Sequence, residues 1–259
     1  MKKIKSLIVL SLMLFVGGQM MAQTRGALFL GAGFPVKDFA EFEGFNDFAL
    51  TTADLDEDDG GAGIGFNAGL KWYFNVGVKG LGVMLSVDGF YNGPSSELKT
   101  AYRERETQIG NQYLGGSFAY EAKPKYINVP AMLGLNYIYH VNPKFGIYLE
   151  AGAGGNLGFI TNMETTNTRT ILGVETRTKS QQSYENALSF AYQAGIGFEV
   201  ARNLLISCSF YDFGKREVKG EEIVKTTTLN DNVTNSVKNY NTFGTLHPIM
   251  IVGRIGFSF

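Results

Sequence analysis

Apolar and polar positions alternate with a period of two along much of this chain. Between residues 64 and 74 every second residue is apolar, and small or polar residues stand between them. A β-strand places successive side chains on opposite faces, so this pattern predicts a strand with one apolar face. Comparable segments predict eight strands in all, the first of them the least regular because Phe29 interrupts its polar face. The expected strands are 25–34, 64–74, 81–91, 126–139, 145–159, 188–200, 204–213 and 248–259.

The connections between these strands alternate between short and long. Segments 75–80, 140–144 and 201–203 are short, whereas 35–63, 92–125, 161–187 and 214–247 are long. Bacterial outer-membrane barrels show this alternation, with tight periplasmic turns and long outer loops. A soluble β-sandwich is the alternative, but it rarely carries four loops of this length. We therefore predict an all-β fold, an eight-stranded antiparallel up-and-down transmembrane β-barrel with both termini in the periplasm.

Two of the long connections carry an alternating pattern of their own. Residues 165–180 alternate around Leu172 and Gly173, and residues 216–243 alternate around 229–232. Both segments predict extracellular hairpins that continue the barrel wall above the membrane. Their faces are too polar for lipid, so they are not counted as spanning strands, and a ten-stranded barrel is the alternative.

The first 22 residues are typical of a secretory signal peptide. Three lysines precede an apolar run at 7–16, and small residues follow it up to Ala22. We expect cleavage after Ala22, which leaves residues 23–259 as a single barrel domain. An N-terminal membrane anchor is the alternative, but the apolar run is shorter than a spanning helix requires.

Composition narrows the class of protein further. The chain has 33 glycines, 20 phenylalanines and 13 tyrosines, a single cysteine and a formal net charge of −1. Glycine and aromatic residues together suit a closed barrel with rings at the membrane interfaces. The lone Cys208 excludes an internal disulfide, and the mild charge gives no reason to expect a nucleic-acid partner.

Aromatic residues gather at the strand ends next to the short connections. In an outer-membrane barrel such rings form a girdle that fixes the height of the protein in the bilayer. Outer-membrane lipid and lipopolysaccharide are therefore expected partners. The girdle residues expected near the short connections include Trp72, Tyr137, Tyr139, Phe257 and Phe259.

One strand carries a distinctive motif. Segment 126–137 starts with Tyr126 and contains Pro130 followed by Leu133, and the proline predicts a bulge or an unpaired point in the wall. The segment resembles the tyrosine–aliphatic–proline–leucine strand of the small outer-membrane β-barrel family of Bacteroidetes-type bacteria, often called porin-like or PorT-like. The terminal Phe259 likewise resembles the signal read by the barrel-assembly machinery. The resemblance implies a fold and an outer-membrane location, without a defined activity.

Four charged residues share the strand face opposite the apolar one. Lys71, Glu150 and Arg254 lie at similar depth from the short connections, and Glu199 lies somewhat lower. An eight-stranded barrel is just wide enough for side chains to fill, and unpaired buried charges are costly. We expect the four to pair as a polar plug near the periplasmic side. Polar packing is favoured over a gate, and conductance recordings on Glu150→Ala separate the two.

Other reactive groups are few. The acidic run from Asp54 to Asp59 resembles the start of a calcium loop, but Gly65 stands where the last acidic ligand belongs. A solvated loop is therefore preferred over a divalent-cation site. His140 falls at a short turn, and His247 falls at the outer rim near Asp212.

The pairing of His247 with Asp212 leaves a hydrolase as a third hypothesis. Both residues share the lipid-facing side of their strands, which favours a role at headgroup level. No zinc spacing or phosphate loop occurs in the sequence, and no cofactor is expected. The preferred function is a non-enzymatic outer-membrane barrel that serves envelope structure or surface interaction through its long outer loops. A narrow porin or secretion-accessory barrel is the alternative, and the extracellular partner is not identified.

Overall fold

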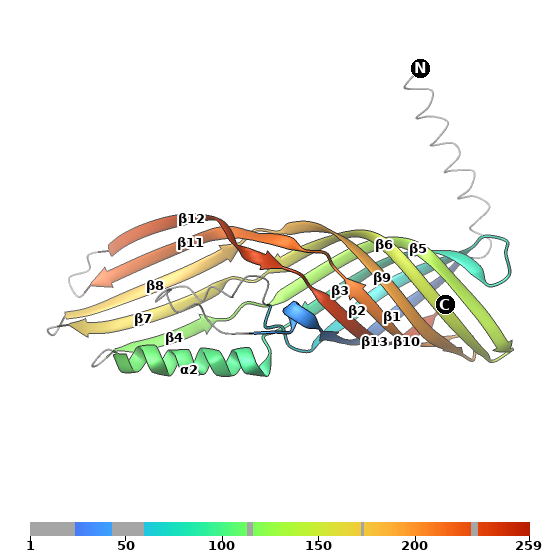
Figure 1. The fold of residues 1–259 in the computed structure, drawn as a ribbon, viewed down its shortest axis with the longest axis horizontal. Coiled ribbons are helices and arrows are strands. Elements are labelled where there is room, and N and C mark those ends of the chain that lie inside the picture. Colours follow the sequence, from blue (N-terminus) through green and yellow to red (C-terminus); the bar gives the residue numbers. More distant parts are fainter. Residues whose placement is uncertain (1–23, 43–59, 113–115, 172–173, 229–232) are drawn as a thin grey trace, which may run out of the picture.

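The computed structural model describes residues 24–42, 60–112, 116–171, 174–228 and 233–259. Within them, eight antiparallel strands close into a barrel in the order β1-β13-β10-β9-β6-β5-β3-β2 (Figure 1). The eight strands predicted from the alternation are thus confirmed, as is the up-and-down order. They are β1 (Thr24–Pro35), β2 (Gly65–Asn75), β3 (Leu81–Asn92), β5 (Tyr126–Asn142), β6 (Phe145–Ile160), β9 (Ala187–Val200), β10 (Leu204–Asp212) and β13 (Ile249–Ser258).

The barrel closes where its first and last strands meet. Gly31 of β1 pairs with Arg254 of β13 on one side and with Asn67 of β2 on the other. A Cβ atom at Gly31 would lie 2.6 Å from Cγ of Arg254 and 2.2 Å from the carbonyl oxygen of Gly253. Glycine is therefore required at position 31, because the Cβ atom of any other residue would overlap the Arg254 side chain and the Gly253 carbonyl oxygen.

The alternation along each strand decides what faces outward. Leu133 is 63% exposed, whereas its neighbour Met132 is 1% exposed and points into the barrel. The single Cys208 also lies on the outer surface. The apolar side chains that form the exposed outer belt include Leu28, Leu30, Phe66, Leu70, Leu85, Val87, Leu135, Leu149, Phe190, Ile196, Phe198, Ile206, Ile251 and Ile255.

Pro130 interrupts the pairing of β5 on one side only. On the β6 side the pairing continues through Pro130, which lies opposite Asn156. On the β3 side the pairing passes from Ala131 directly to Asn128. Proline has no amide hydrogen to donate, so the unpaired point predicted for the wall lies between β3 and β5.

A second sheet extends beyond one end of the barrel (Figure 1). Its strands, in the order β12-β11-β8-β7-β4, are β12 (Val233–Leu246), β11 (Arg216–Thr228), β8 (Val174–Tyr184), β7 (Met163–Ile171) and β4 (Ser117–Ala122). The two predicted hairpins are confirmed as β7–β8 and β11–β12, while residues 172–173 and 229–232 lie outside the described residues. The hairpins pair with each other in a separate sheet, so the barrel has eight strands and not ten.

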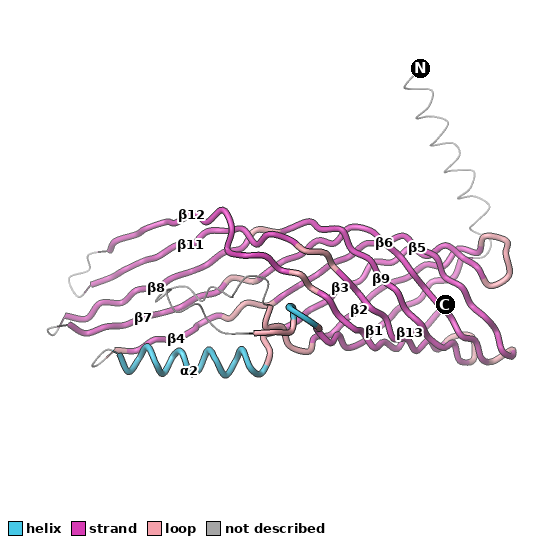
Figure 2. The backbone as a smooth tube through the Cα atoms, viewed as in Figure 1, coloured by secondary structure: helices cyan, strands magenta, loops and turns pink. Residues whose placement is uncertain are grey.

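The connection 92–125 contains two elements that the sequence analysis did not predict. They are helix α2 (Ser96–Gln112) and strand β4, which lie side by side along one edge of the second sheet (Figure 2). The Ser95 hydroxyl accepts the amide hydrogen of Leu98 at 3.1 Å and caps the helix. The Tyr102 ring packs 4.5 Å from that of Tyr120 in β4.

Side chains fill the barrel interior in layers. A cluster near the second sheet contains Phe90, Met132, Tyr211, Phe213, Met250 and Val252, and a cluster nearer the short turns contains Ala27, Phe29, Tyr73, Met84, Tyr148 and Leu205. The short helix η2 (Lys37–Phe39) brings Phe39 into the first cluster, where its ring lies edge-on to Tyr126 at 5.4 Å. Part of the predicted loop 35–63 therefore covers the end of the lumen next to the second sheet.

Among the helices of the described residues, none is both long and apolar enough to cross a membrane.

Candidate functional site

A network of four charged side chains occupies the lumen between the two apolar clusters. Glu150 pairs with Lys71, and its Oε1 atom also lies 3.1 Å from Nη2 of Arg254. Arg254 reaches Asp88 as well, with Nη1 at 3.2 Å from Oδ1. Two cations thus face two carboxylates from strands β2, β3, β6 and β13, and none of the four side chains is more than 1% exposed.

Neutral groups complete this network, which we call the lumen ion network. Arg254 donates to the Tyr211 hydroxyl at 2.6 Å and to the Ser209 hydroxyl at 3.0 Å. Tyr211 in turn donates to Asp88 at 3.2 Å. The Phe29 ring lies 5.1 Å from the Arg254 guanidinium and 5.4 Å from the Lys71 ammonium, within range of a cation–π interaction.

The structure brings together three of the four residues expected in the plug. Asp88 completes the network, and Glu199 is not part of it. Glu150 pairs across the wall with Gly195, and Glu199 lies four residues farther along β9, opposite Gly146. Four residues of strand correspond to roughly 13 Å, which separates Glu199 from the network.

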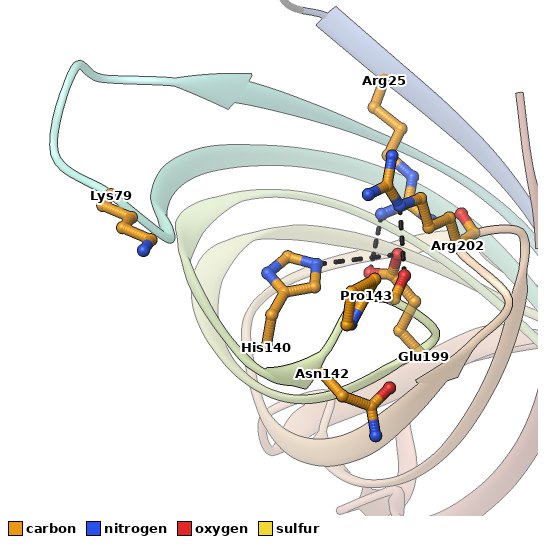
Figure 3. A pocket seen from close by; sticks show the side chains of 7 residues that line it. All are labelled: Arg25, Lys79, His140, Asn142, Pro143, Glu199 and Arg202. Carbon is orange, nitrogen blue, oxygen red and sulfur yellow. Dashed lines mark hydrogen bonds and ion pairs between the residues drawn. The ribbon is translucent and has the colours of Figure 1, made fainter.

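Glu199 instead belongs to an open pocket of about 650 Å³ at the end of the barrel that carries the short turns (Figure 3). Its Oε2 atom lies 2.8 Å from Nη1 of Arg25, and its Oε1 atom lies 3.9 Å from Nε2 of His140. Arg25 also donates to the Arg202 carbonyl and to the Ser258 hydroxyl. Arg25 therefore links the first strand to β9 and to the last strand at the seam of the barrel.

His247 and Asp212 meet as expected. Nε2 of His247 lies 3.0 Å from Oδ1 of Asp212. The same carboxylate accepts the amide hydrogen of Gly214 at 2.8 Å and the Tyr192 hydroxyl at 2.6 Å. Each oxygen of the Asp212 carboxylate thus accepts at least one hydrogen bond. Asp212 is the last residue of β10, at the end of the barrel next to the second sheet.

A layer of neutral polar side chains and one arginine lies where the barrel meets the second sheet. Arg216, the first residue of β11, donates from Nη1 to Oδ1 of Asn128 at 2.8 Å. Asn156 donates to the same oxygen at 3.1 Å and to the Ser189 hydroxyl at 3.3 Å. Sequence reasoning missed Arg216, because it assigned that residue to the outer hairpin 216–243.

The expected girdle residues lie on the outer surface or close to it, near the short turns. Trp72 is half-buried, and the other four are exposed. Those four are Tyr137, Tyr139, Phe257 and Phe259.

Within the part of the chain that the structure describes, no three histidine, cysteine, aspartate or glutamate side chains are grouped as a metal site. The acidic run 54–59 lies outside the described residues, as does the expected signal peptide 1–22.

No family model and no curated protein matches the sequence. Several solved structures resemble it in fold. Ail of Yersinia pestis, solved in complex with the heparin analogue sucrose octasulfate, is 15% identical with a TM-score of 0.36 over 92% of this chain and 99% of that chain. A major outer membrane protein from Thermus thermophilus is 11% identical with a TM-score of 0.39 over 92% and 100%. The outer membrane protein OprG from Pseudomonas aeruginosa is 12% identical with a TM-score of 0.34 over 91% and 94%.

The wall and the lumen of the barrel indicate the cellular location of the protein. Hydrocarbon cannot hydrogen-bond a free strand edge, so a sheet spans a membrane only when it closes on itself, as this one does. Its apolar belt faces outward and its polar groups face inward, the distribution of an outer-membrane barrel. The chain is a small β-barrel protein of the bacterial outer membrane.

Proposed function

We propose that this protein is a closed, non-enzymatic membrane anchor that presents its second sheet to partners outside the cell. The observation that carries the proposal is the second sheet itself, a five-stranded unit with its own helix that stands beyond the apolar belt. Short turns face the periplasm in barrels of this class and long loops face outward, which gives the second sheet an extracellular position. The start of β1 and the end of β13 then lie on the periplasmic side.

The lumen ion network supports a closed anchor over a pore. Its charged side chains are excluded from solvent and balance one another, so opening a water path would require breaking several charge-assisted hydrogen bonds. A narrow porin or secretion-accessory barrel is the second candidate function, and it requires this network to open.

One face of the second sheet favours an anionic partner. Lys179 of β8 and Lys225 of β11 lie directly opposite each other, and Arg177 lies two residues along, all three exposed. Like charges directly opposite are destabilising in a sheet, and an anion relieves that repulsion. Together with Glu175, Thr227 and Thr228 they line a pocket of about 430 Å³.

The position of this cation patch indicates where its partner comes from. Arg177 lies seven residues from Tyr184, where β8 returns to the barrel, which corresponds to roughly 24 Å of strand. Lipid phosphates at the membrane surface lie below that height. We therefore propose a sulfated or phosphorylated surface glycan as the partner class.

The test replaces the three cations together by glutamine in the full chain. Proteoliposomes carrying the wild type should bind a sulfated glycan column and elute with salt, and the triple variant should lose most of that retention. Glu217→Gln, on an exposed residue of β11 outside the patch, is the matched control and should behave like the wild type. Equal retention of triple variant and wild type would contradict the partner class.

A barrel-embedded hydrolase remains the third hypothesis, based on His247 and Asp212. The carboxylate already accepts hydrogen bonds from Tyr192 and from the Gly214 amide, which indicates a structural tie at the rim. Lipid and peptide hydrolysis by wild type and His247→Ala should be equal and at background. Contact with lipopolysaccharide, recognition of the Phe259 strand by the assembly machinery and membership of the Bacteroidetes-type family stay predictions.

A further inference from the structure

Arg216 is a buried cation without an acidic partner among the described residues. Its side chain lies at the junction of barrel and second sheet and is only 6% exposed. Within the described ranges, its side chain donates one hydrogen bond, to Oδ1 of Asn128, which belongs to a neutral amide. Arg254, at a similar degree of burial, meets both Glu150 and Asp88. The two buried arginines therefore differ in whether their charge is balanced.

The charge on Arg216 persists at neutral pH. Burial lowers the pKa of its guanidinium to about 10, which is still well above neutrality. An ion removed from water without a counter-charge is strongly unfavourable. The fold therefore needs a negative charge next to this residue.

Three polar atoms of this layer have no hydrogen-bond partner among the described residues. Nη2 of Arg216 and Nδ2 of Asn128 are donors without an acceptor, and Oδ1 of Asn156 is an acceptor without a donor. The Asn128 amide cannot turn to relieve this, because its Oδ1 atom already accepts from both Arg216 and Asn156. The orphaned donors thus belong to two side chains that are bonded to each other and held in place.

The wall of the barrel is shaped around the guanidinium. A Cβ atom at Gly158 of β6 would lie 1.6 Å from Nη1 of Arg216, so only glycine leaves room for it. Tyr126, whose hydroxyl donates to the Gly60 carbonyl at 2.5 Å, lies in the adjoining apolar cluster. The Arg216 side chain therefore lies in a defined buried site and not on the protein surface.

We propose that Arg216 and Asn128 bind a small inorganic anion, such as chloride, at this junction. Two N–H donors, one on a cation, are what such an anion requires, and the site offers both without an acceptor. A water molecule could accept the same hydrogen bonds but would leave the charge unbalanced. The anion would fasten β11, and with it the second sheet, to β5 of the barrel.

Bromide, which scatters anomalously and substitutes for chloride, tests the proposal directly. Crystals of the full chain grown in bromide should show an anomalous peak within hydrogen-bond distance of Nη2 of Arg216, and crystals of Arg216→Met should lack it. A wild-type map without the peak, or with a carboxylate of the chain on Nη2, would overturn the proposal.

A solution measurement supplies the second readout. At constant ionic strength, replacing gluconate by chloride should raise the wild-type Tm by about 3–5 °C per tenfold chloride above the dissociation constant. Asn128→Asp supplies an internal counter-charge, so its Tm should not respond to chloride, and it keeps the test valid should Arg216→Met fail to fold. Lys225→Met, which removes an exposed cation, is the control and should respond as the wild type does. A chloride response retained in Asn128→Asp would also overturn the proposal.

Discussion

The barrel and the second sheet are built from the same kind of strand, yet they distribute polarity in opposite ways. On β9 of the barrel the outward side chains include Leu188 and Phe190, which are 80% and 66% exposed. On β8, which precedes it in the chain, the outward side chains include Arg177 and Lys179. The barrel keeps its charges inside, where they pair in the lumen ion network. The difference shows that the surrounding solvent, lipid or water, selects the residues of each face.

The largest expected effect comes from breaking the charge balance inside the barrel. Glu150→Ala leaves Lys71 and Arg254 without their shared carboxylate, and removing one partner of a buried ion pair costs about 3–5 kcal/mol. Urea unfolding in detergent, followed by Trp72 fluorescence, measures the loss. Glu217→Ala, at an exposed ion pair of the second sheet, should change the free energy of unfolding by less than about 0.5 kcal/mol.

The outer surfaces give the next contrast. Leu133→Arg places a charge in the apolar belt at the middle of β5 and should cost about 2–4 kcal/mol, as an arginine near the bilayer midplane does. Ile223→Arg makes the same change on the exposed face of β11, where water solvates the charge, and should cost close to nothing. Unfolding from lipid bilayers measures both. Equal costs at the two sites would contradict the division between lipid-facing and water-facing surfaces.

The smallest effect is a dependence of helix α2 and strand β4 on alkaline pH. Burial raises the pKa of Tyr120 in β4 to about 12, and burial also raises the pKa of its neighbour Tyr102 well above its ordinary value. Because the folded pKa exceeds the unfolded value near 10, this contribution is complete below pH 10 and is lost as the pH rises through 12. Hydrogen exchange measured relative to the intrinsic rate should show no change in the protection of α2 up to about pH 10 and a progressive loss of protection above it.

Much of the barrel could be predicted because one face of each strand contacts lipid and is therefore apolar, which produces the alternation in the sequence. Phe29 appeared irregular since it lies on the polar side of β1, and the structure gives the reason: its ring packs against the two cations of the lumen ion network. The place of Asp88 in the network was not accessible in the same way. Depth counted along a single strand ignores the stagger of a closed barrel, which shifts each strand relative to the next.

The elements outside the membrane were harder to predict for a different reason. Helix α2 buries only one narrow stripe, and its signals were a serine cap at Ser95 followed by Leu98, Tyr102 and Ile109 at helical spacing. Its remaining residues are polar and gave no periodicity to detect. Arg216 was missed because alternation within a hairpin does not reveal that its first residue turns back into the lumen.

Conductance of single molecules in a planar bilayer tests the central claim that the barrel is a closed anchor. The account predicts that the wild-type protein, inserted in 1 M KCl with a large-pore porin as the positive control, gives no current steps above the baseline. Stable ohmic steps from the wild type would show a continuous water path past Lys71, Glu150 and Arg254, and would contradict the account.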